Sequence, residues 1–193
     1  MNYNDYKISR NLSWEIILNE KICALPVRMS ALCRQMGISV KTDEALSTGG
    51  YTHNVNGTPM IFVSASDSTE RQRFTTAHEL GHILLGHVGK YELVNREPSP
   101  NDNPIEQAAN VFASRLLAPA CVLWGCGVRS ADEIAELCKI SHIAAEYRFT
   151  RLTELYERNK FLTSPLERKV YQHFSEFIEQ NQLHNISSGA SFI

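Results

Sequence analysis

The chain has 193 residues, of which 43% are hydrophobic and 21% are charged, and its formal net charge is −2. This length suits one compact domain with a short extension rather than two large domains. The balanced charge excludes the strongly basic surface with which many proteins bind nucleic acid, and the sequence predicts neither a signal peptide nor an apolar run of the roughly 18 residues that cross a membrane. We therefore expect a cytoplasmic protein.

The first predicted elements are two helices, over residues 12–23 and 26–35, and a strand over residues 38–41. Two more strands, over residues 51–55 and 58–63, are separated by Asn56-Gly57. This dipeptide fits a two-residue hairpin turn because both positions tolerate positive φ. Helices followed by a small sheet and then by further helices predict an α+β fold.

The next helix is predicted to begin with a capping box formed by Asp67 and Glu70 and to end at Gly86. It carries His78-Glu79-Leu80-Gly81-His82, in which two histidines four positions apart lie on the same helix face. Zinc binds imidazole nitrogens, and a catalytic zinc site leaves one position open for water, for which Glu79 would be the general base. A surface helix with solvated side chains is the alternative, but the apolar stripe of the helix would make an unpartnered group of this kind costly to bury. The pentapeptide thus indicates hydrolysis, most simply of a peptide bond.

A third protein ligand must come from elsewhere in the chain. His87 is close in sequence, but the metzincin pattern requires glycine and histidine where this chain has Leu85 and Val88. Because His87 follows Gly86 at the helix end, we expect its side chain to point away from the two motif histidines, toward solvent.

A second helix offers a better candidate. Asn103 is predicted as its N-cap, Pro104 as its first residue, and Pro119 marks its end. Glu106 could supply an oxygen ligand, and Asn110, one turn later, could hold a ligating histidine by a hydrogen bond. Glu106 also occupies the capping-box position relative to Asn103, so spacing alone leaves the roles of ligand and cap both open.

Two blocks of sequence, residues 73–82 and 106–119, resemble in this order the ImmA/IrrE family of zinc metallo-endopeptidases, which are gluzincin-like. Weaker similarity upstream extends the resemblance to about residues 12–155. The second block ends in Ala-Pro where the family usually has Met-Pro, a departure that concerns packing more than chemistry.

The resemblance implies one zinc ion bound by His78, His82 and Glu106, with Glu79 as the catalytic base. It implies a small zincin-like domain in which a three-stranded sheet packs on the motif helix and the second ligand helix. It also implies a narrow protein substrate, a helix-turn-helix repressor of the XRE type whose cleavage derepresses phage, mobile-element or stress genes. The alternative function is a regulatory binding module that docks to a repressor or toxin partner and keeps a structural or vestigial zinc site.

The strand before the motif helix is a candidate for binding the substrate. In zinc peptidases of this kind, the sheet edge beside the metal pairs with an extended peptide. The residues predicted for this role are Met60, Ile61, Phe62 and Val63. An ordinary core strand explains the same four residues equally well.

The C-terminal part of the chain is helical in pattern. Residues 132–138 and 141–158 resemble a helix-turn-helix, with Ser141 as the N-cap of the second helix. One face of that helix is predicted to present Ala144, Tyr147, Arg148 and Leu152. Residues 129–160 contain six Lys or Arg and six Asp or Glu, and this zero net charge favours packing against the zinc domain over direct binding of nucleic acid.

These patterns predict a domain organisation. A zincin-like domain covers residues 1–120, a helical extension covers 121–183 with a last helix over 166–180, and residues 184–193 form a disordered tail. The proline-rich connection over residues 88–104 is predicted to be a mobile loop beside the site. The five cysteines are scattered along the sequence, which predicts reduced thiols. Cys121 and Cys126 could alternatively bind a metal or act in redox chemistry, but ordinary buried or partly exposed thiols are the favoured interpretation.

Overall fold

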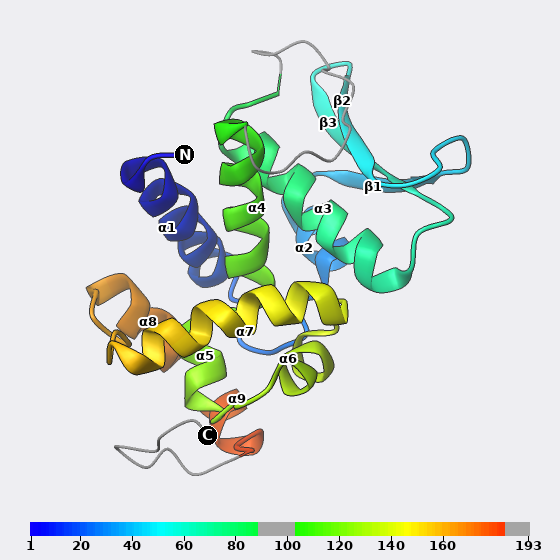
Figure 1. Ribbon diagram of the computed structural model, residues 1–193. Coiled ribbons are helices and arrows are strands. Elements are labelled where there is room, and N and C mark those ends of the chain that lie inside the picture. Colours follow the sequence, from blue (N-terminus) through cyan, green and yellow to red (C-terminus); the bar gives the residue numbers. More distant parts are fainter. Residues whose placement is uncertain (89–102, 184–193) are drawn as a thin grey trace. The chain divides into compact units, whose positions relative to one another are not determined.

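The computed structural model describes residues 1–88 and 103–183, and the fold is α+β as predicted (Figure 1). The chain divides into two compact units, one formed by Met1–Ser13 and Arg28–Ser114, the other by Trp14–Val27 and the chain from Arg115 onward. Whether residues 1–120 fold as an independent domain is a separate question from this division, so the predicted boundary at residue 120 stays a prediction. The predicted tail, and residues 89–102 of the predicted loop, lie outside the described residues.

The first unit contains a three-stranded sheet with the order β1-β3-β2. Strand β1 (Ser39–Asp43) pairs in parallel with β3 (Thr58–Ser64), and β2 (Gly50–Val55) pairs antiparallel with β3. Asn56 and Gly57 join β2 to β3 with φ values of 52° and 84°, which are the two left-handed conformations that the predicted hairpin turn requires. The hairpin prediction is therefore confirmed.

Strand β3 is the central strand, and this position contradicts the substrate-binding role predicted for it. Met60, Ile61, Phe62 and Val63 pair with β1 on one side and with β2 on the other. Their backbone groups already belong to two ladders, so they offer no edge to which an extended peptide could add. The prediction of strand addition at these four residues is wrong, and the edges of this sheet belong to β1 and β2.

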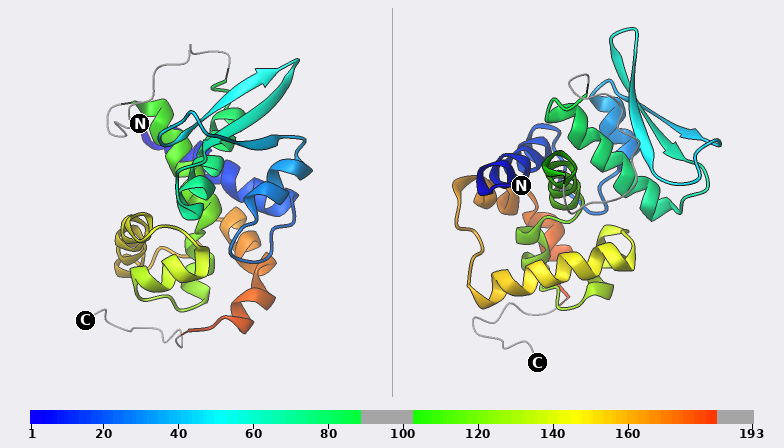
Figure 2. Two further views of the ribbon diagram at one scale, coloured as in Figure 1. Left: turned by 90° about the vertical axis from the view of Figure 1, so that its right-hand side faces the viewer. Right: turned by 45° about the horizontal axis from the view of Figure 1, so that its top comes forward.

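Helix α3 (Thr69–Leu84) packs against the sheet and carries the two motif histidines. Side chains alternate across the strands, so that Thr52 of β2 and Ile61 and Val63 of β3 are buried. Helices α2 (Met29–Gln35) and α3 lie on the same face of the sheet (Figure 2). A sheet packed on the motif helix was predicted, and the structure confirms it.

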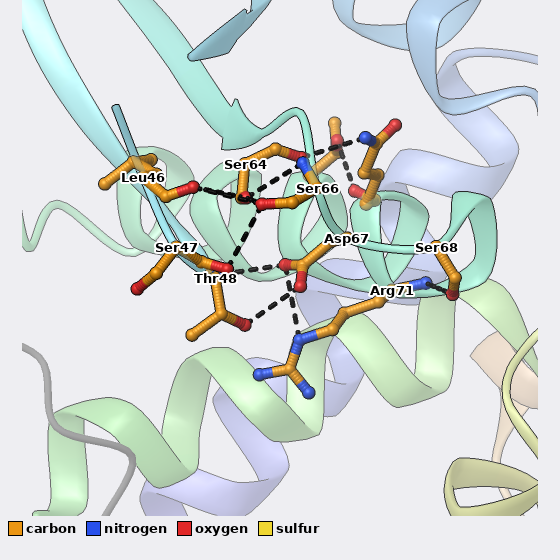
Figure 3. Close-up of polar contacts among 11 residues, drawn as sticks. Leu46, Ser47, Thr48, Ser64, Ser66, Asp67, Ser68 and Arg71 are labelled. Atoms are coloured by element: carbon orange, nitrogen blue, oxygen red, sulfur yellow. Dashed lines mark hydrogen bonds and ion pairs between the residues drawn. The ribbon is translucent and has the colours of Figure 1, made fainter. Parts of the chain in front are cut away.

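The start of α3 differs from the predicted capping box. Ser68 is the N-cap, and its hydroxyl accepts a hydrogen bond from the backbone N–H of Arg71. Asp67 instead accepts hydrogen bonds from the Thr48 hydroxyl and the Gly49 backbone N–H, at 2.9 and 2.8 Å, and pairs with Arg71 (Figure 3). Both residues are good helix caps, and Asp67 is drawn away because the loop before β2 presents it with two donors.

The same loop is held at a second point. The Ser64 hydroxyl donates to the Leu46 carbonyl at 2.7 Å, and the Ser66 hydroxyl lies 3.2 Å from the Ser47 carbonyl (Figure 3). These contacts join the end of β3 to the loop that leads into β2. The polar cluster therefore fixes where β2 begins relative to α3.

Helix α4 (Pro104–Leu117) brings the second predicted block of site residues next to α3, on the side away from the sheet (Figure 2). Asn103 caps it as predicted, since its side-chain oxygen accepts a hydrogen bond from the Ile105 backbone N–H at 2.9 Å. The two helices approach closely at Gly81, where an added Cβ would lie 3.0 Å from the ring of the fully buried Phe112. A side chain at position 81 would therefore compete with Phe112 for space.

The N-terminal helices start or end away from their predicted positions. Helix α1 (Tyr3–Asn19) begins nine residues earlier than the predicted start at residue 12 and ends before Cys23. Helix α2 begins at Met29 rather than at residue 26 and is followed by Gly37 with φ 73°. The left-handed glycine confirms the predicted end of the second helix.

The second unit is built from helices α5 (Ala120–Gly125), α6 (Ala131–Cys138), α7 (His142–Glu157), α8 (Pro165–His173) and α9 (Ser175–Gln180). Ser141 caps α7 as predicted, and its hydroxyl accepts a hydrogen bond from the Ala144 backbone N–H. The buried face of α7 consists of Ala145, Arg148 and Leu152, whereas Tyr147 is 76% exposed. The predicted last helix is two helices, which meet at Phe174.

Arg148 is a basic residue on the buried face of α7, and a hydrogen bond explains how it can lie there. Its guanidinium Nε donates a hydrogen bond of 2.7 Å to the carbonyl oxygen of Ala118, which follows the last turn of α4. The carbonyl groups at a helix C-terminus lack partners within the helix, and a cation there is favourable. Arg148 thus has a structural role inside this unit.

The buried cysteines behave as apolar core residues. All five cysteines are free, and Cys121 and Cys126 are fully buried. Burial raises the pKa of Cys121 to about 12 and that of Cys126 to about 11, so both stay protonated at neutral pH. Ordinary buried thiols therefore describe this pair better than ligands or a redox couple.

One helical segment has the length and composition of a possible membrane span. By length and composition, Pro104–Gly125 could cross a membrane, so the expectation that no segment approaches such a span is wrong. However, 72% of its most apolar window is buried inside the protein, which is also typical of a core helix.

Candidate metal centre

Three side chains from two helices meet at one point in the first unit. His78 and His82 lie one turn apart on α3, and their Nε2 atoms are 2.9 Å apart. Glu106, in the first turn of α4, places Oε2 3.1 Å from Nε2 of His78 and Oε1 3.4 Å from Nε2 of His82. These are the residues predicted as metal ligands, and their donor atoms all lie within 4.8 Å of one another.

The spacing of these atoms fits a small metal ion. In a tetrahedral zinc site with bonds of about 2.0–2.1 Å, neighbouring ligand atoms are separated by the tetrahedron edge, about 3.3 Å. The three separations observed here, 2.9, 3.1 and 3.4 Å, are close to that edge. Two nitrogens and a carboxylate oxygen are also the donor set that zinc accepts in proteins.

Asn110 sets the hydrogen-bonding state of His78. Its side-chain oxygen Oδ1 lies 2.9 Å from Nδ1 of His78. An amide oxygen can only accept, so Nδ1 of His78 carries a proton. Nε2 can then donate to Glu106 when the ring is doubly protonated, or present a lone pair to a metal ion when the ring is neutral. The structure thus places Asn110 where the sequence predicted it, one turn after Glu106 and against a histidine of the motif.

The inward-facing atoms require positive charge between them. Hydrogen bonds from His78 and then from His82 hold the pKa of the Glu106 carboxyl well below its ordinary value, so this group is ionised at neutral pH. An anionic oxygen beside converging imidazole nitrogens can be satisfied by protons on those nitrogens or by a bound cation. This chemistry, together with the spacing, shows that the residues fit a metal ion.

Glu79 is held by a residue that the sequence did not single out. The Glu79 side chain is buried, with 1% of its surface exposed, and the Thr52 hydroxyl donates a hydrogen bond of 2.8 Å to its Oε2. Thr52 lies on β2 and is itself buried. The alternation along β2 could have placed Thr52 on the helix side of the sheet, but nothing local indicated that Glu79 would lie above it.

His87 lies elsewhere than the sequence predicted. Its ring packs against that of His82, with centroids 5.2 Å apart and the two Nδ1 atoms 3.0 Å apart. The expectation that His87 points away from the motif histidines into solvent is therefore wrong. The overlooked signal was Gly86, whose left-handed φ of 71° turns the chain back toward the helix.

Comparison with known proteins gives the family to which a chain with this fold and this candidate metal site belongs. Residues 33–150 match the M78 peptidase family, described as the IrrE N-terminal-like domain. Since this match covers more than half of the chain, the chain belongs to that family, and the predicted membership in the ImmA/IrrE group is confirmed.

Among relatives, the chain is 32% identical over 112 residues to the radiation response metalloprotease IrrE of Deinococcus radiodurans. The similarity covers 52% of this chain and 32% of that protein, so the chain spans about a third of the relative's length. Among solved structures, a Mycobacterium tuberculosis transcriptional regulator aligns with a TM-score of 0.49 and 16% identity, covering 77% of this chain and 47% of that one.

Proposed function

We propose that this chain is a zinc-dependent endopeptidase that uses a single metal ion held by His78, His82 and Glu106. The observation that carries the proposal is the convergence of these three side chains from two helices at separations of 2.9–3.4 Å, with a buried glutamate next in sequence to the first of them. Three protein ligands leave a fourth position for water or substrate, as catalytic zinc sites do. Membership in a metallopeptidase family supports the same conclusion.

Zinc bound by these side chains would act as a Lewis acid, polarising the scissile carbonyl and lowering the pKa of an adjacent water. Glu79 then serves as the base that takes the proton from the attacking water and delivers it to the leaving amine. The Thr52 hydroxyl holds the Glu79 carboxyl group in place by donating a hydrogen bond of 2.8 Å to its Oε2. Asn110 keeps the ring of His78 oriented and its proton on Nδ1.

The substrate is proposed to lie along β2 rather than β3. Strand β2 is an edge of the sheet and carries Thr52, which contacts Glu79. Its outer edge therefore runs next to the proposed base. An extended peptide added there would gain backbone hydrogen bonds while its scissile bond comes near Glu79. This arrangement places substrate and base on neighbouring elements of one unit.

For the identity of the substrate, we propose a helix-turn-helix repressor of the XRE type, cleaved at one site in the cytoplasm so that the genes it represses are expressed. Resemblance to the ImmA/IrrE family supports a regulatory substrate of this kind. In this arrangement the chain acts on the DNA-binding protein and does not itself need to bind DNA. Its zero net charge over residues 129–160 is consistent with that division of roles.

The test is a cleavage assay with the purified chain, zinc and the repressor encoded nearest to its gene. We expect one discrete pair of fragments from wild type and none from Glu79→Gln, which removes the base but none of the three ligands. Glu136→Gln is the matched control, because its side chain is 81% exposed on α6. Removing a general base costs about 10²–10⁴-fold in rate.

The two functional hypotheses give opposite results in this assay. If Glu79→Gln cleaves the repressor as fast as wild type, the proposed mechanism is wrong. If neither protein cleaves it, yet both relieve repression in cells, the chain acts as a binding module.

A further inference from the structure

The C-terminus of α3 has a backbone arrangement that returns the chain to its own last turn. The backbone N–H of Gly86 donates to the Ile83 carbonyl at 3.1 Å, and that of His87 donates to the His82 carbonyl at 2.9 Å. With Leu85 as C-cap and Gly86 at φ 71°, these two bonds form a Schellman motif. In this motif the residue after the glycine contacts the residue three positions before the C-cap, and here those two residues are His87 and His82.

The contact between them is a polar one. Their Nδ1 atoms are 3.0 Å apart and their rings meet at 64°, edge toward face. His82 is nearly fully buried, with 2% of its surface exposed, so its Nδ1 depends on a protein partner. A hydrogen bond between two imidazole nitrogens requires that one carries the proton and the other presents a lone pair.

The position of His82 in the site decides which nitrogen is the donor. Its Nε2 faces Nε2 of His78 and the Glu106 carboxylate, and a nitrogen that binds a metal must present a lone pair. The proton of the His82 ring is then on Nδ1, which donates to His87. His87 therefore accepts through Nδ1 and carries its own proton on Nε2.

We propose that His87 is a positioning residue of the metal centre, which fixes the tautomer and ring orientation of His82 by accepting a hydrogen bond from its Nδ1–H. The proposal rests on the proposed function, since it takes His82 to be a ligand. Each ligating histidine then has its own partner. Asn110 from α4 holds His78, and His87 from the turn after α3 holds His82.

Zinc affinity is the first test, measured by competition with a chromophoric chelator so that no activity is needed. His87→Leu removes the acceptor, and we expect the dissociation constant for zinc to rise about 10–100-fold, the usual effect of losing a partner of a metal-binding histidine. His87→Asn returns an oxygen acceptor near the position of Nδ1 and should restore most of the affinity. The control is His142→Leu, a histidine 57% exposed on α7, which should bind zinc like wild type. Circular dichroism establishes that each variant is folded.

Two outcomes separate this proposal from the one on which it rests. If wild type binds no zinc, or His78→Ala binds it as tightly as wild type, the metal centre itself is wrong. If zinc binding depends on His78 while His87→Leu binds within about twofold of wild type, well below the effect expected for a lost partner, only the role of His87 is overturned.

The tautomer gives a second measurement that needs no variant. Long-range ¹H–¹⁵N correlation spectra of the zinc-loaded protein, labelled at histidine, distinguish a protonated Nδ1 from a protonated Nε2. We expect His82 to carry its proton on Nδ1 and His87 on Nε2. A proton on Nδ1 of His87 would contradict the proposal, because that nitrogen could not then accept.

Discussion

At the scale of single residues, the carboxylate of Glu79 depends on a strand for its position. A charged group with 1% exposure is stable only when it is hydrogen-bonded, and the Thr52 hydroxyl on β2 provides such a bond at 2.8 Å. Thr52 is thus a positioning residue that acts through the base.

Replacing Thr52 should slow the reaction without weakening metal binding. Thr52→Val keeps the shape of the side chain but removes the donor, and losing a hydrogen bond to a charged group costs about 1.5–3 kcal/mol, equivalent to about 10–150-fold in kcat. Thr52→Ser keeps the hydroxyl and should recover most of the rate. Steady-state kinetics on a peptide spanning the cleavage site, with zinc affinity measured in parallel, separates the two effects. An unchanged kcat for Thr52→Val would show that the bond is only structural.

At the scale of elements, the metal centre depends on the distance between α3 and α4. Two of the proposed ligands come from α3 and the third from α4, so the helices must approach until Glu106 reaches both histidines. Gly81 permits this approach, because the Phe112 ring lies against the position where a Cβ would be. The glycine of the motif therefore has a packing role one residue before a proposed ligand.

Gly81→Ala tests this packing role, because it gains helix propensity but crowds the core, and the second effect is expected to be the larger. Alanine favours a helix over glycine by about 1 kcal/mol, but overpacking a core costs about 1–3 kcal/mol. Phe112 is fully buried and has little room to move, so we expect a net loss of up to about 2 kcal/mol in the free energy of unfolding and weaker zinc binding. Urea unfolding measures the first quantity and chelator competition the second.

A second variant separates crowding from other effects of alanine. In Gly81→Ala/Phe112→Leu the smaller side chain makes room for the new methyl group, so the double variant should lose less stability than the sum of the two single variants. Strict additivity would contradict the explanation based on Phe112.

Elements with strong local signals were predictable from the sequence. The Asn56-Gly57 turn, the Asn103 and Ser141 caps and the end of the second helix at Gly37 each depend on the conformation of a few adjacent residues. For the same reason, the helix positions of His78, His82 and Asn110 could be read from their spacing.

Features that depend on distant partners were not predictable in this way. The central position of β3 follows from parallel pairing with β1, for which sequence alternation has no signature. Asp67 does not cap α3 because it accepts a hydrogen bond from a loop some twenty residues earlier in the chain. His87 turns toward the helix because Gly86 has a left-handed conformation. The break at Phe174 has no glycine or proline to mark it.

At the scale of the whole molecule, metal binding should contribute directly to stability. Any ligand that binds only the folded state stabilises it, and zinc at about 100 times its dissociation constant contributes about 2.7 kcal/mol. Glu106 is 24 residues after His82 in sequence, so the three proposed ligands come together only in the folded chain.

Adding zinc should therefore raise the melting temperature by about 5–10 °C, and a chelator should reverse the shift. The change is measured by differential scanning calorimetry with and without the metal. His78→Ala should melt at the same temperature in both conditions. A shift of equal size in that variant would mean that zinc binds elsewhere.

The order in which the ligands occur along the chain also matters for biosynthesis. During translation His78 and His82 leave the ribosome first, and Glu106 follows only after a further 24 residues. A nascent chain that ends before α4 has a pair of imidazoles but no carboxylate to complete the set, and the partner of His78 is missing as well. The proposed metal site can therefore be complete only after α4 has been synthesised and has packed against α3, and a chain that ends before α4 cannot form it.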